Sequence, residues 1–356
     1  MVRPSAPQYG VLASNAAIVN SWHPVARSVE VNTSPQAITL LQRQVVLWRT
    51  PSGQVFASAD RCPHREAPLS AGEVHAGCLV CPYHGWEFGD EGRCVRIPSA
   101  TPGLPAPPKA HLQPFHCAER YGLVWVCLGT PRDDIPTMHF EDDPTFRRIN
   151  TAVERWKSSA TRMVDNFLDI THFPFVHTGT FGGAQDPTVP KIEMRDLDDG
   201  YYGYSYEVIA KNTTGGTVAS GQTGDTVNRA MSTGFILPFV ARSTVRYETG
   251  LEHIIWMLSA PIDDVTSYFT FVIWRNDDFS MSAEEVIRFD LAIGAEDKKM
   301  LEKVPGMLTL DNTTLVSVQA DKCNVEWRRR LIALMAEADA AEAASPIAHA
   351  SPAAGS

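Results

Sequence analysis

Short runs of alternating or continuously apolar residues dominate roughly the first 130 positions of the chain. Four of these runs read AITLLQRQVVLWR, QVFASA, GCLVCP and YGLVWVCLG, and turns rich in Gly, Pro and charged residues separate them. Short strands punctuated in this way are typical of an antiparallel sheet. The pattern therefore predicts a small β domain, to which we assign residues 15–135.

The period of the apolar positions changes further along the chain. Residues 160–177 follow a helical pattern, residues 201–275 return to strands, and residues 282–302 and 321–338 are again helical. The segments HIIWMLSAPI and SYFTFVIWRN have the β-branched and aromatic content of long strands. We therefore expect a second domain of mixed α and β structure over residues 136–338.

Four segments lack either period. The Pro-rich residues 99–114 predict a surface excursion, and residues 131–146 predict a connector between the domains. The Gly/Thr-rich residues 212–226 predict a loop, without the Lys that a phosphate-binding loop requires. Residues 339–356 are rich in Ala, Ser and Pro, and we expect a disordered tail there.

Composition narrows the possible functions. A formal net charge of -10 argues against nucleic acid as a partner, because binding the phosphate backbone needs a basic surface. No stretch approaches the roughly 18 apolar residues of a membrane span, and the N-terminus lacks the apolar core of a secretory signal. Seven cysteines cannot all pair in disulfides. We expect a cytoplasmic protein with reduced thiols and no membrane contact.

The segment CPHREAPLSAGEVHAGCLVCPYH carries the first candidate chemistry. Cys62 and His64 form one Cys-x-His pair, and Cys81 and His84 form a Cys-x-x-His pair after a gap of sixteen residues. Structural zinc sites usually combine two similar Cys-rich pairs, whereas here each pair offers one thiolate and one imidazole. This division suits a [2Fe–2S] cluster in which two Cys bind one iron and two His bind the other. A zinc site remains the alternative.

A second group of ligand residues lies in the segment DNFLDITHFPFVH. His172 and His177 are five positions apart, and Asp169 precedes His172 by one helical turn. Pro174 is expected to break the helix and turn His177 back toward His172. Two His and one carboxylate form the facial triad of non-haem Fe(II) oxygenases. Taken alone, a His pair in an aromatic segment is more often part of a core.

Together these motifs give the chain a resemblance to a known family. CPH with CPYHGW resembles the Rieske ferredoxin domain, and DNFLDITHFPFVH resembles the Asn-x-x-Asp-x-x-His-x-x-x-x-His motif of Rieske non-haem iron oxygenases. The resemblance to their catalytic α subunits covers roughly residues 15–335. It implies an α+β fold, in which an antiparallel β Rieske domain precedes a helix-grip (START-like) catalytic domain with a twisted antiparallel sheet.

The resemblance also implies site roles in the first domain. Cys62 and Cys81 would bind one iron of the cluster, and His64 and His84 would bind the other. The loops that cover the cluster would include four further residues, namely Pro63, Pro82, Gly85 and Trp86.

The third ligand of the mononuclear iron has four candidates, Asp290, Asp297, Asp311 and Asp321. The segment GAEDKKMLEKV resembles the Glu-Asp-Lys segment of the iron-binding helix in the demethylases of the family, which favours Asp297. Those relatives usually continue to a Gln where this chain has Val304. Asp311 is the second choice.

In the family, the carboxylate at the position of Asp169 is not an iron ligand. It joins an iron-ligating His to a cluster His of another subunit, so Asp169 would connect His172 with His84 of a neighbouring chain. The resemblance therefore implies a ring of subunits, most simply a homotrimer. Asn166 would support this bridge, while Asp165 has no counterpart in the motif and is expected to be structural.

The resemblance is strongest to the vanillate, dicamba and caffeine demethylases and the natural-product tailoring hydroxylases. It implies a monooxygenase that uses O2, a [2Fe–2S] cluster and mononuclear Fe(II) to hydroxylate or demethylate a small organic substrate. The chain has no dinucleotide-binding motif and no plant-type ferredoxin spacing, so electrons from NAD(P)H need a separate ferredoxin or flavin reductase.

Three alternatives to the monooxygenase remain open. They are a ring-dihydroxylating dioxygenase, a Rieske electron-transfer or redox-sensing protein, and a zinc-stabilised binding protein. The sequence does not identify the substrate. Five apolar residues are candidates for the substrate pocket, and each is equally compatible with sheet core: Phe235, Leu237, Phe239, Trp256 and Met257.

Overall fold

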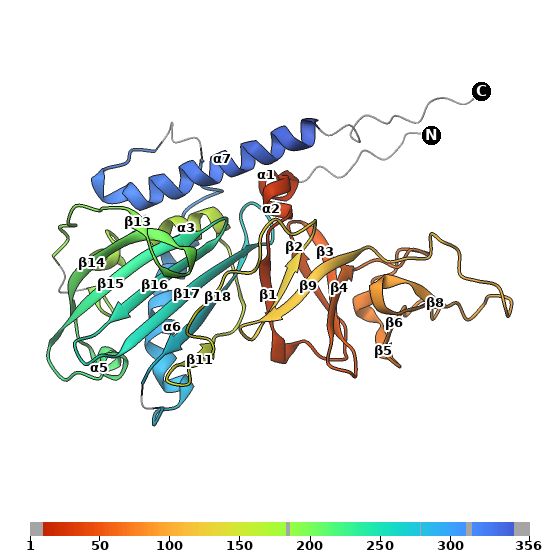
Figure 1. Ribbon diagram of the computed structural model, residues 1–356, viewed down its shortest axis with the longest axis horizontal. Coiled ribbons are helices and arrows are strands. Elements are labelled where there is room, and N and C mark those ends of the chain that lie inside the picture. The colour runs from red at the N-terminus through yellow and green to blue at the C-terminus, as the bar shows by residue number, and fades with distance from the viewer. Residues whose placement is uncertain (1–9, 183–185, 278, 311–314, 345–356) are drawn as a thin grey trace.

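The computed structural model describes residues 10–182, 186–277, 279–310 and 315–344. Three antiparallel sheets follow one another along the long axis of the molecule (Figure 1). The α+β class and the succession of an antiparallel domain and a larger sheet with helices confirm the expected fold class. No helix in the described ranges is long and apolar enough to cross a membrane.

The central sheet has six strands in the order β1-β10-β9-β4-β3-β2. Its strands are β1 (His23–Arg27), β2 (Gln36–Leu40), β3 (Arg43–Arg49), β4 (Val55–Ala59), β9 (Pro114–Arg120) and β10 (Leu123–Cys127). The apolar runs of the sequence form its buried interior, since all five residues of β10 and four successive residues of β3 are buried.

A small sheet of four strands is inserted between β4 and β9. Its strands are β5 (Glu73–His75), β6 (Cys78–Val80), β7 (Glu87–Phe88) and β8 (Cys94–Arg96), paired in that order. It occupies the end of the molecule farthest from the largest sheet (Figure 1). The Pro-rich segment after β8 is mostly exposed up to residue 109, as expected of a surface excursion.

The largest sheet has eight strands. Seven follow the order β11-β18-β17-β16-β15-β14-β13, and β12 pairs with β18 beside β11. The strands are β11 (Arg147–Asn150), β12 (Glu154–Trp156), β13 (Arg195–Asp196), β14 (Tyr202–Lys211), β15 (Thr226–Ile236), β16 (Val240–Arg246), β17 (Glu252–Pro261) and β18 (Ser267–Arg275). The expected domain boundary at residues 135 and 136 lies between β10 and β11 and stays a prediction.

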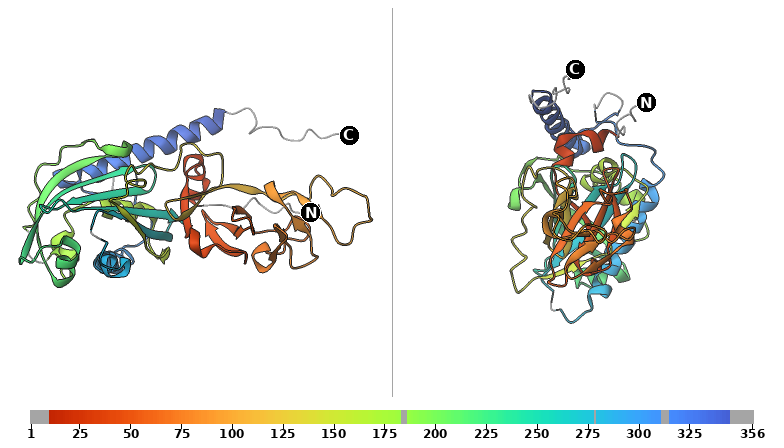
Figure 2. Two further views of the ribbon diagram at one scale, coloured as in Figure 1. Left: turned by 60° about the horizontal axis from the view of Figure 1, so that its bottom comes forward. Right: turned by 90° about the vertical axis from the view of Figure 1, so that its right-hand side faces the viewer.

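Helices pack against the largest sheet, and the last helix also contacts the N-terminal helices. They are α1 (Val11–Ser14), α2 (Ala16–Val19), α3 (Ala160–Leu168), α4 (Phe173–Val176), α5 (Thr214–Ser220), α6 (Ala283–Leu301) and α7 (Lys322–Ala344). Figure 2 shows α7 passing over α1 and α2. There the Asn15 side chain donates to the Met335 carbonyl at 3.0 Å and to Asp339 at 2.7 Å.

Two expectations about irregular segments were wrong. Residues 214–220 of the Gly/Thr-rich segment form α5, because the Thr213 side chain caps the helix by accepting from the Gly216 amide. Helix α7 reaches Ala344, so residues 339–344 are helical rather than part of a disordered tail. The Ala- and Glu-rich composition there favours a helix. Residues 345–356 lie outside the described part of the chain.

Candidate metal centres

The two Cys-His pairs sit on turns of the same construction. In the first turn, the Cys62 amide donates to the Ala67 carbonyl and the Glu66 amide donates to the Cys62 carbonyl, both at 2.9 Å. In the second, the Cys81 amide donates to the Trp86 carbonyl at 2.8 Å and the Gly85 amide donates to the Cys81 carbonyl at 3.0 Å. Both turns need a left-handed residue at the fourth position after Cys, with φ of 61° at Glu66 and 69° at Gly85. Local backbone bonds therefore hold the two loops in matching shapes.

The side chains on these turns fit a [2Fe–2S] cluster. Cys62 and Cys81 are 1% and 2% exposed and form no disulfide. Burial raises the pKa of the Cys62 thiol to about 11, so binding as a thiolate needs the charge of a metal. The His64 ring stacks on Trp86 at 4.5 Å, and its Nδ1 atom is buried without a hydrogen-bond partner among the described residues. An unpartnered imidazole nitrogen beside two buried thiols suits metal ligation better than a closed core.

The His84 side chain completes the group. Its ring lies 4.6 Å from that of His64, between ring centroids, and the residue is exposed. The loops occupy the far end of the molecule (Figure 1), and the exposed imidazole is accessible from outside the chain. Such a position suits electron exchange with another protein surface.

The second candidate centre begins where α3 ends. Asp169 leaves the helical conformation, with φ of -90° and ψ of 137°, and accepts from the Thr171 amide and hydroxyl at 2.7 Å. A short helix, α4, then restarts with Pro174 in its first turn. This break places the Nε2 atoms of His172 and His177 3.1 Å apart, so the expected approach of His177 to His172 is confirmed. The expected cause was wrong, because the helix already ends at Leu168 and Pro174 lies in the first turn of α4.

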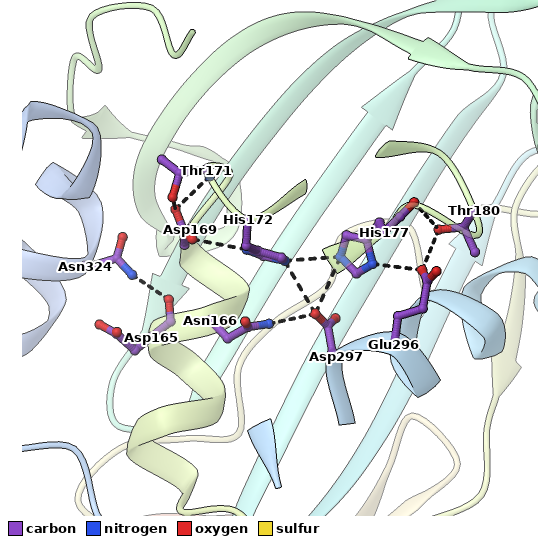
Figure 3. Close-up of polar contacts among 10 residues, drawn as sticks. All are labelled: Asp165, Asn166, Asp169, Thr171, His172, His177, Thr180, Glu296, Asp297 and Asn324. Carbon is purple, nitrogen blue, oxygen red and sulfur yellow. Dashed lines mark hydrogen bonds and ion pairs between the residues drawn. The ribbon is translucent and has the colours of Figure 1, made fainter. Parts of the chain in front are cut away.

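Asp297, from the middle of α6, meets the two imidazoles (Figure 3). Its Oδ1 atom lies 3.4 Å from His172 Nε2 and 3.5 Å from His177 Nε2. Two ligands that bind one metal at about 2.1 Å and at right angles are about 3 Å apart. The three atoms therefore have nearly the spacing of one triangular face of an octahedral site, and one ligand atom from each residue lies within 4.8 Å of the other two.

Carboxylates hold the outer nitrogens of both imidazoles. His172 Nδ1 lies 3.2 Å from Asp169 Oδ2, and His177 Nδ1 lies 3.1 Å from Glu296 Oε2. Each contact favours a proton on Nδ1 and leaves Nε2 free for a metal. Glu296 is itself fixed by the Thr180 hydroxyl at 2.7 Å and the Gly179 amide at 2.9 Å. Sequence reasoning did not assign Glu296 a role, although it precedes Asp297 in the segment that carried the resemblance.

The charges around the two imidazoles differ. Burial opposes protonation of His172, but the hydrogen bonds that it donates to Asp169 and Asp297 outweigh burial and raise its pKa to about 9. Burial dominates at His177 and lowers its pKa. The Asp169 pKa is lowered, since its bonds to His172 and Thr171 outweigh the effect of burial. A metal cation held by these groups would supply the positive charge that the proton on His172 otherwise supplies.

Of the two residues at the start of the motif, Asn166 has a different contact from the expected one, and Asp165 has the expected role. Asn166, expected to support Asp169, instead donates from Nδ2 to Asp297 Oδ1 at 3.0 Å and so orients that carboxylate. Asp165 faces away from the histidines, and its backbone carbonyl accepts from Asn324 at 2.5 Å (Figure 3). Its side chain lies 3.9 Å from Arg328, in agreement with the expected structural role.

Two of the competing candidates for the third ligand have other hydrogen-bond partners. Asp290 accepts from His253 at 3.1 Å, and Asp321 accepts from the Val318 amide at 2.6 Å. Asp311 lies outside the described residues. A further group with ligand atoms close together, His139 with Asp198 and Asp199, already contains the cation of Arg242, which forms ion pairs with both carboxylates.

A mostly apolar cavity of about 90 Å³ opens from His172, His177 and Asp297 between α3, α6 and the largest sheet. Met257 lines it, as expected. Trp256 does not, because neighbouring residues of a strand face opposite sides, and it packs against Tyr121 and Trp274 instead. The other three pocket candidates line a separate cavity beside β1, and their assignment to the substrate pocket was wrong: Phe235, Leu237 and Phe239.

Comparison with known proteins agrees with this architecture. Residues 21–115 match the Rieske [2Fe-2S] domain family, and residues 156–337 match the vanillate O-demethylase oxygenase C-terminal domain family. The chain is 32% identical over 320 residues to methylxanthine N1-demethylase NdmA of Pseudomonas putida, with 87% of each chain covered. It is 30% identical over 329 residues to methylxanthine N3-demethylase NdmB of the same organism, with 86% of this chain and 87% of the relative covered.

Solved structures share the fold along nearly the whole chain. The structure of Pseudomonas putida NdmA with caffeine has a TM-score of 0.77 at 29% identity, covering 90% of this chain and 92% of that chain. A dicamba monooxygenase bound to 3,6-dichlorosalicylic acid has a TM-score of 0.78 at 23% identity, covering 93% and 100%, and this likeness concerns the fold alone.

A Rieske domain joined to a domain with a metal site of two histidines and one aspartate defines an O2-dependent iron–sulfur oxygenase. The chain belongs to the Rieske oxygenase α subunits, in the branch that contains the methylxanthine, dicamba and vanillate demethylases. It is the terminal oxygenase of a Rieske monooxygenase or demethylase system.

Proposed function

We propose that this oxygenase holds a mononuclear ferrous ion and a [2Fe–2S] cluster, and inserts one oxygen atom from O2 into a small organic substrate. The iron ligands are His172, His177 and Asp297. The cluster ligands are Cys62, His64, Cys81 and His84. The observation that carries the proposal is the convergence of two imidazole nitrogens and one carboxylate oxygen at the spacing of a facial triad.

The protein groups have defined tasks at this centre. When bound, the ferrous ion supplies a site for O2 activation, and the cluster supplies electrons one at a time. Glu296 and Asp169 orient the two imidazoles, while Asn166 orients Asp297. The cavity lined by aromatic and aliphatic side chains excludes water and holds the substrate beside the triad.

The positions of two residues support electron transfer between subunits. His84 is exposed at one end of the chain, whereas Asp169 lines a surface groove of about 270 Å³ in the other domain. With the cluster loops and the largest sheet at opposite ends (Figure 1), an internal route within one chain is long. We assign Asp169 as the link from His172 to His84 of the partner subunit, in a homotrimer.

The electron source and the substrate complete the proposal. NAD(P)H delivers electrons through a separate ferredoxin or flavin reductase, which docks near the exposed cluster loops. The substrate is hydroxylated or loses a methyl group, the latter supported by relatives named as methylxanthine N1- and N3-demethylases. All seven cysteines are free, which supports a reducing, cytoplasmic location.

Metal analysis and an electron-driven assay test this proposal. Anaerobically reconstituted protein should contain about three irons and about two acid-labile sulfides per chain and show a Rieske absorption spectrum. With NADH, a generic reductase and a panel of methoxy- and N-methyl compounds, it should release formaldehyde or hydroxylated product. About two irons and no turnover indicate an electron carrier, and colourless protein with zinc indicates a binding protein; either result contradicts the proposal.

A further inference from the structure

The cavity that opens from the candidate iron ligands has a second polar end, formed by Arg229. This residue belongs to β15, where Val227, Arg229 and Met231 are buried and the residues between them are exposed. Successive alternate residues of a strand share one face, so Arg229 points inward between two apolar neighbours. It is 4% exposed and lines the same cavity as His172 and His177.

The guanidinium of Arg229 has no protein partner for much of its hydrogen-bonding edge. Its Nε and Nη2 atoms are buried, and within the described ranges neither has a hydrogen-bond partner. Aromatic rings occupy its surroundings instead, with Cζ at 5.1 Å from the Phe181 ring centroid and 5.9 Å from that of Tyr247. Stacking holds the plane of a guanidinium in position and leaves its N–H edge available.

The other charged groups at this end of the cavity already have partners. Arg275 donates from Nη1 to His253 Nδ1 at 3.3 Å, which leaves the proton of that ring on Nε2, 3.1 Å from Asp290 Oδ1. Arg275 also pairs with Asp277 at 2.9 Å. Asp290 has His253 as its partner through Oδ1, whereas its Oδ2 atom is buried without a hydrogen-bond partner among the described residues. Asp290 forms no ion pair with Arg229 within the described part of the chain, although both act electrostatically on Tyr247.

Burying a charged group without a partner is costly, so such a group usually has a ligand. A guanidinium remains charged in proteins, and its fork matches carboxylate and sulfonate oxygens. Building on the proposed oxygenase function, we infer that Arg229 binds the anionic group of an aromatic carboxylate or sulfonate substrate. With Arg229 in this role, the enzyme binds anionic substrates more tightly than neutral ones of the same shape.

The length of the cavity limits the size of the substrate. Asp290 and Asp297, which mark its two ends on α6, are seven residues apart, which is about 10 Å along a helix axis. A single aromatic ring with the anion on one side and the reacting carbon on the other spans most of this length. Phe181, Met231 and Val245 provide the apolar walls between the ends.

Equilibrium binding to the holoenzyme tests the inference without turnover. The probes are 4-methoxybenzoate, 4-methylbenzenesulfonate and the neutral 4-methoxybenzamide, each titrated calorimetrically. The better anion should bind at least roughly tenfold more tightly than the amide. Arg229→Gln should weaken binding of the anions roughly 10- to 100-fold and leave the amide nearly unchanged. The tighter of the two anions identifies the carboxylate or the sulfonate as the recognised group.

Matched variants separate binding from a structural role. Arg246→Gln removes an exposed arginine of the adjacent strand β16, paired with Glu252, and should not change the preference for anions. Without ligand, Arg229→Gln should melt at or above the temperature of the parent, because it removes an unpaired buried charge. If Arg229→Gln does not fold, the test is the ratio of the affinity for the anion to the affinity for the amide in Arg229→Lys. A lower ratio supports the proposal, because Lys keeps the charge and lacks the fork.

Three results would overturn the inference. They are equal affinity of the parent for the anions and the amide, an unchanged ratio in the folded Arg229 variants, and no binding of either anion at the solubility limit. Iron content is measured on the same samples. Loss of the mononuclear iron contradicts the proposed function, whereas the affinity ratio reports on Arg229 separately, since Arg229 is not among the candidate iron ligands.

Discussion

The two candidate metal centres differ in how the chain builds them. All four candidate cluster ligands lie between residues 62 and 84, on two turns closed by backbone hydrogen bonds within each loop. The candidate iron ligands come from α4 and its flanks and from α6, so His172 and Asp297 meet only when these helices pack. The cluster loops are at one end of the molecule with an exposed His84, whereas His177 and Asp297 are 1% and 5% exposed.

The cluster site therefore depends on local backbone structure, whereas the iron site depends on how distant helices pack. Substitutions that loosen the packing of α6 should release iron before they affect the cluster, because the cluster loops do not depend on that helix. Substitutions in the loops should have the opposite selectivity. Each experiment below tests whether the two centres are independent.

The largest effect is expected from loss of an iron ligand. His177→Ala should reduce iron affinity and activity by more than about 100-fold, since removing a ligand exceeds the effect of removing the partner that orients it. The Rieske absorption and EPR spectra should remain. His116→Ala, an exposed histidine of β9, is the control and should keep both metals. Loss of the cluster in His177→Ala would show that the domain assignment is wrong.

The corresponding substitution at the other centre removes a cluster ligand from the cluster loops. Cys81→Ser should abolish the Rieske spectrum and steady-state turnover while the mononuclear site still binds ferrous iron, which can be measured by metal analysis. Cys94→Ser changes a partly buried thiol of β8 that donates to the Arg96 carbonyl at 3.5 Å, and this variant should retain the spectrum. An equally bleached Cys94→Ser variant contradicts the ligand assignment.

A smaller effect distinguishes two carboxylates that contact imidazoles in the same way. Asp169→Asn should keep both metals but slow reduction of the iron centre in single-turnover experiments, by roughly 10- to 100-fold. Glu296→Gln should mainly weaken iron binding, because Glu296 supports His177 rather than the proposed link to the partner subunit. Equal electron-transfer rates in Asp169→Asn and the parent protein rule out the link.

The smallest effect is expected at the contact between the central sheet and the largest sheet. His23 of β1 is 1% exposed, packs 6.4 Å from the Phe239 ring, and lies 2.9 Å from the Ile18 carbonyl through Nε2. Burial lowers its pKa from 6.5 to about 4, in spite of the bond to Ile18. The unfolded chain therefore binds this proton more readily than the folded chain.

The sign of the pH effect follows from that depressed pKa. The contribution of neutral, buried His23 to the free energy of unfolding is fully present above pH 6.5. This contribution decreases as the pH falls toward 4, by up to about 3 kcal/mol. His23→Gln should remove this part of the pH dependence, measured as the difference in unfolding free energy between parent and variant at pH 7 and pH 4.5. A constant difference contradicts the assignment, and both metal spectra at pH 7 serve as the control.

The parts of this molecule that the sequence predicted are those with local causes. The cluster motif and the His pair are specified by spacing, and the long strands by period and composition. Asp297 came only from a resemblance, because no local pattern indicates which of several aspartates on a distant helix meets the histidines. The contacts of Glu296 and Asn166 depend on the same packing and were not anticipated.

The errors have physical reasons. Trp256 and Met257 were both expected in the pocket, yet adjacent strand residues cannot share a face. Helix α5 was missed because two glycines weaken the helical signal, while the cap at Thr213 compensates. Arg229 also escaped notice, since a single arginine among polar and apolar strand residues has the appearance of an exposed position until the fold shows which face is inside.

The exposed position of His84, at the end of the chain away from Asp169, has a consequence for genetics. If electrons pass from each copy to its neighbour, a ring that mixes one copy without a cluster and another without an iron ligand contains some intact donor–acceptor pairs. Two alleles that are each null, such as Cys81→Ser and His177→Ala, should then complement each other when expressed together. Under this proposal, the inherited unit of activity is the assembled ring rather than the single polypeptide.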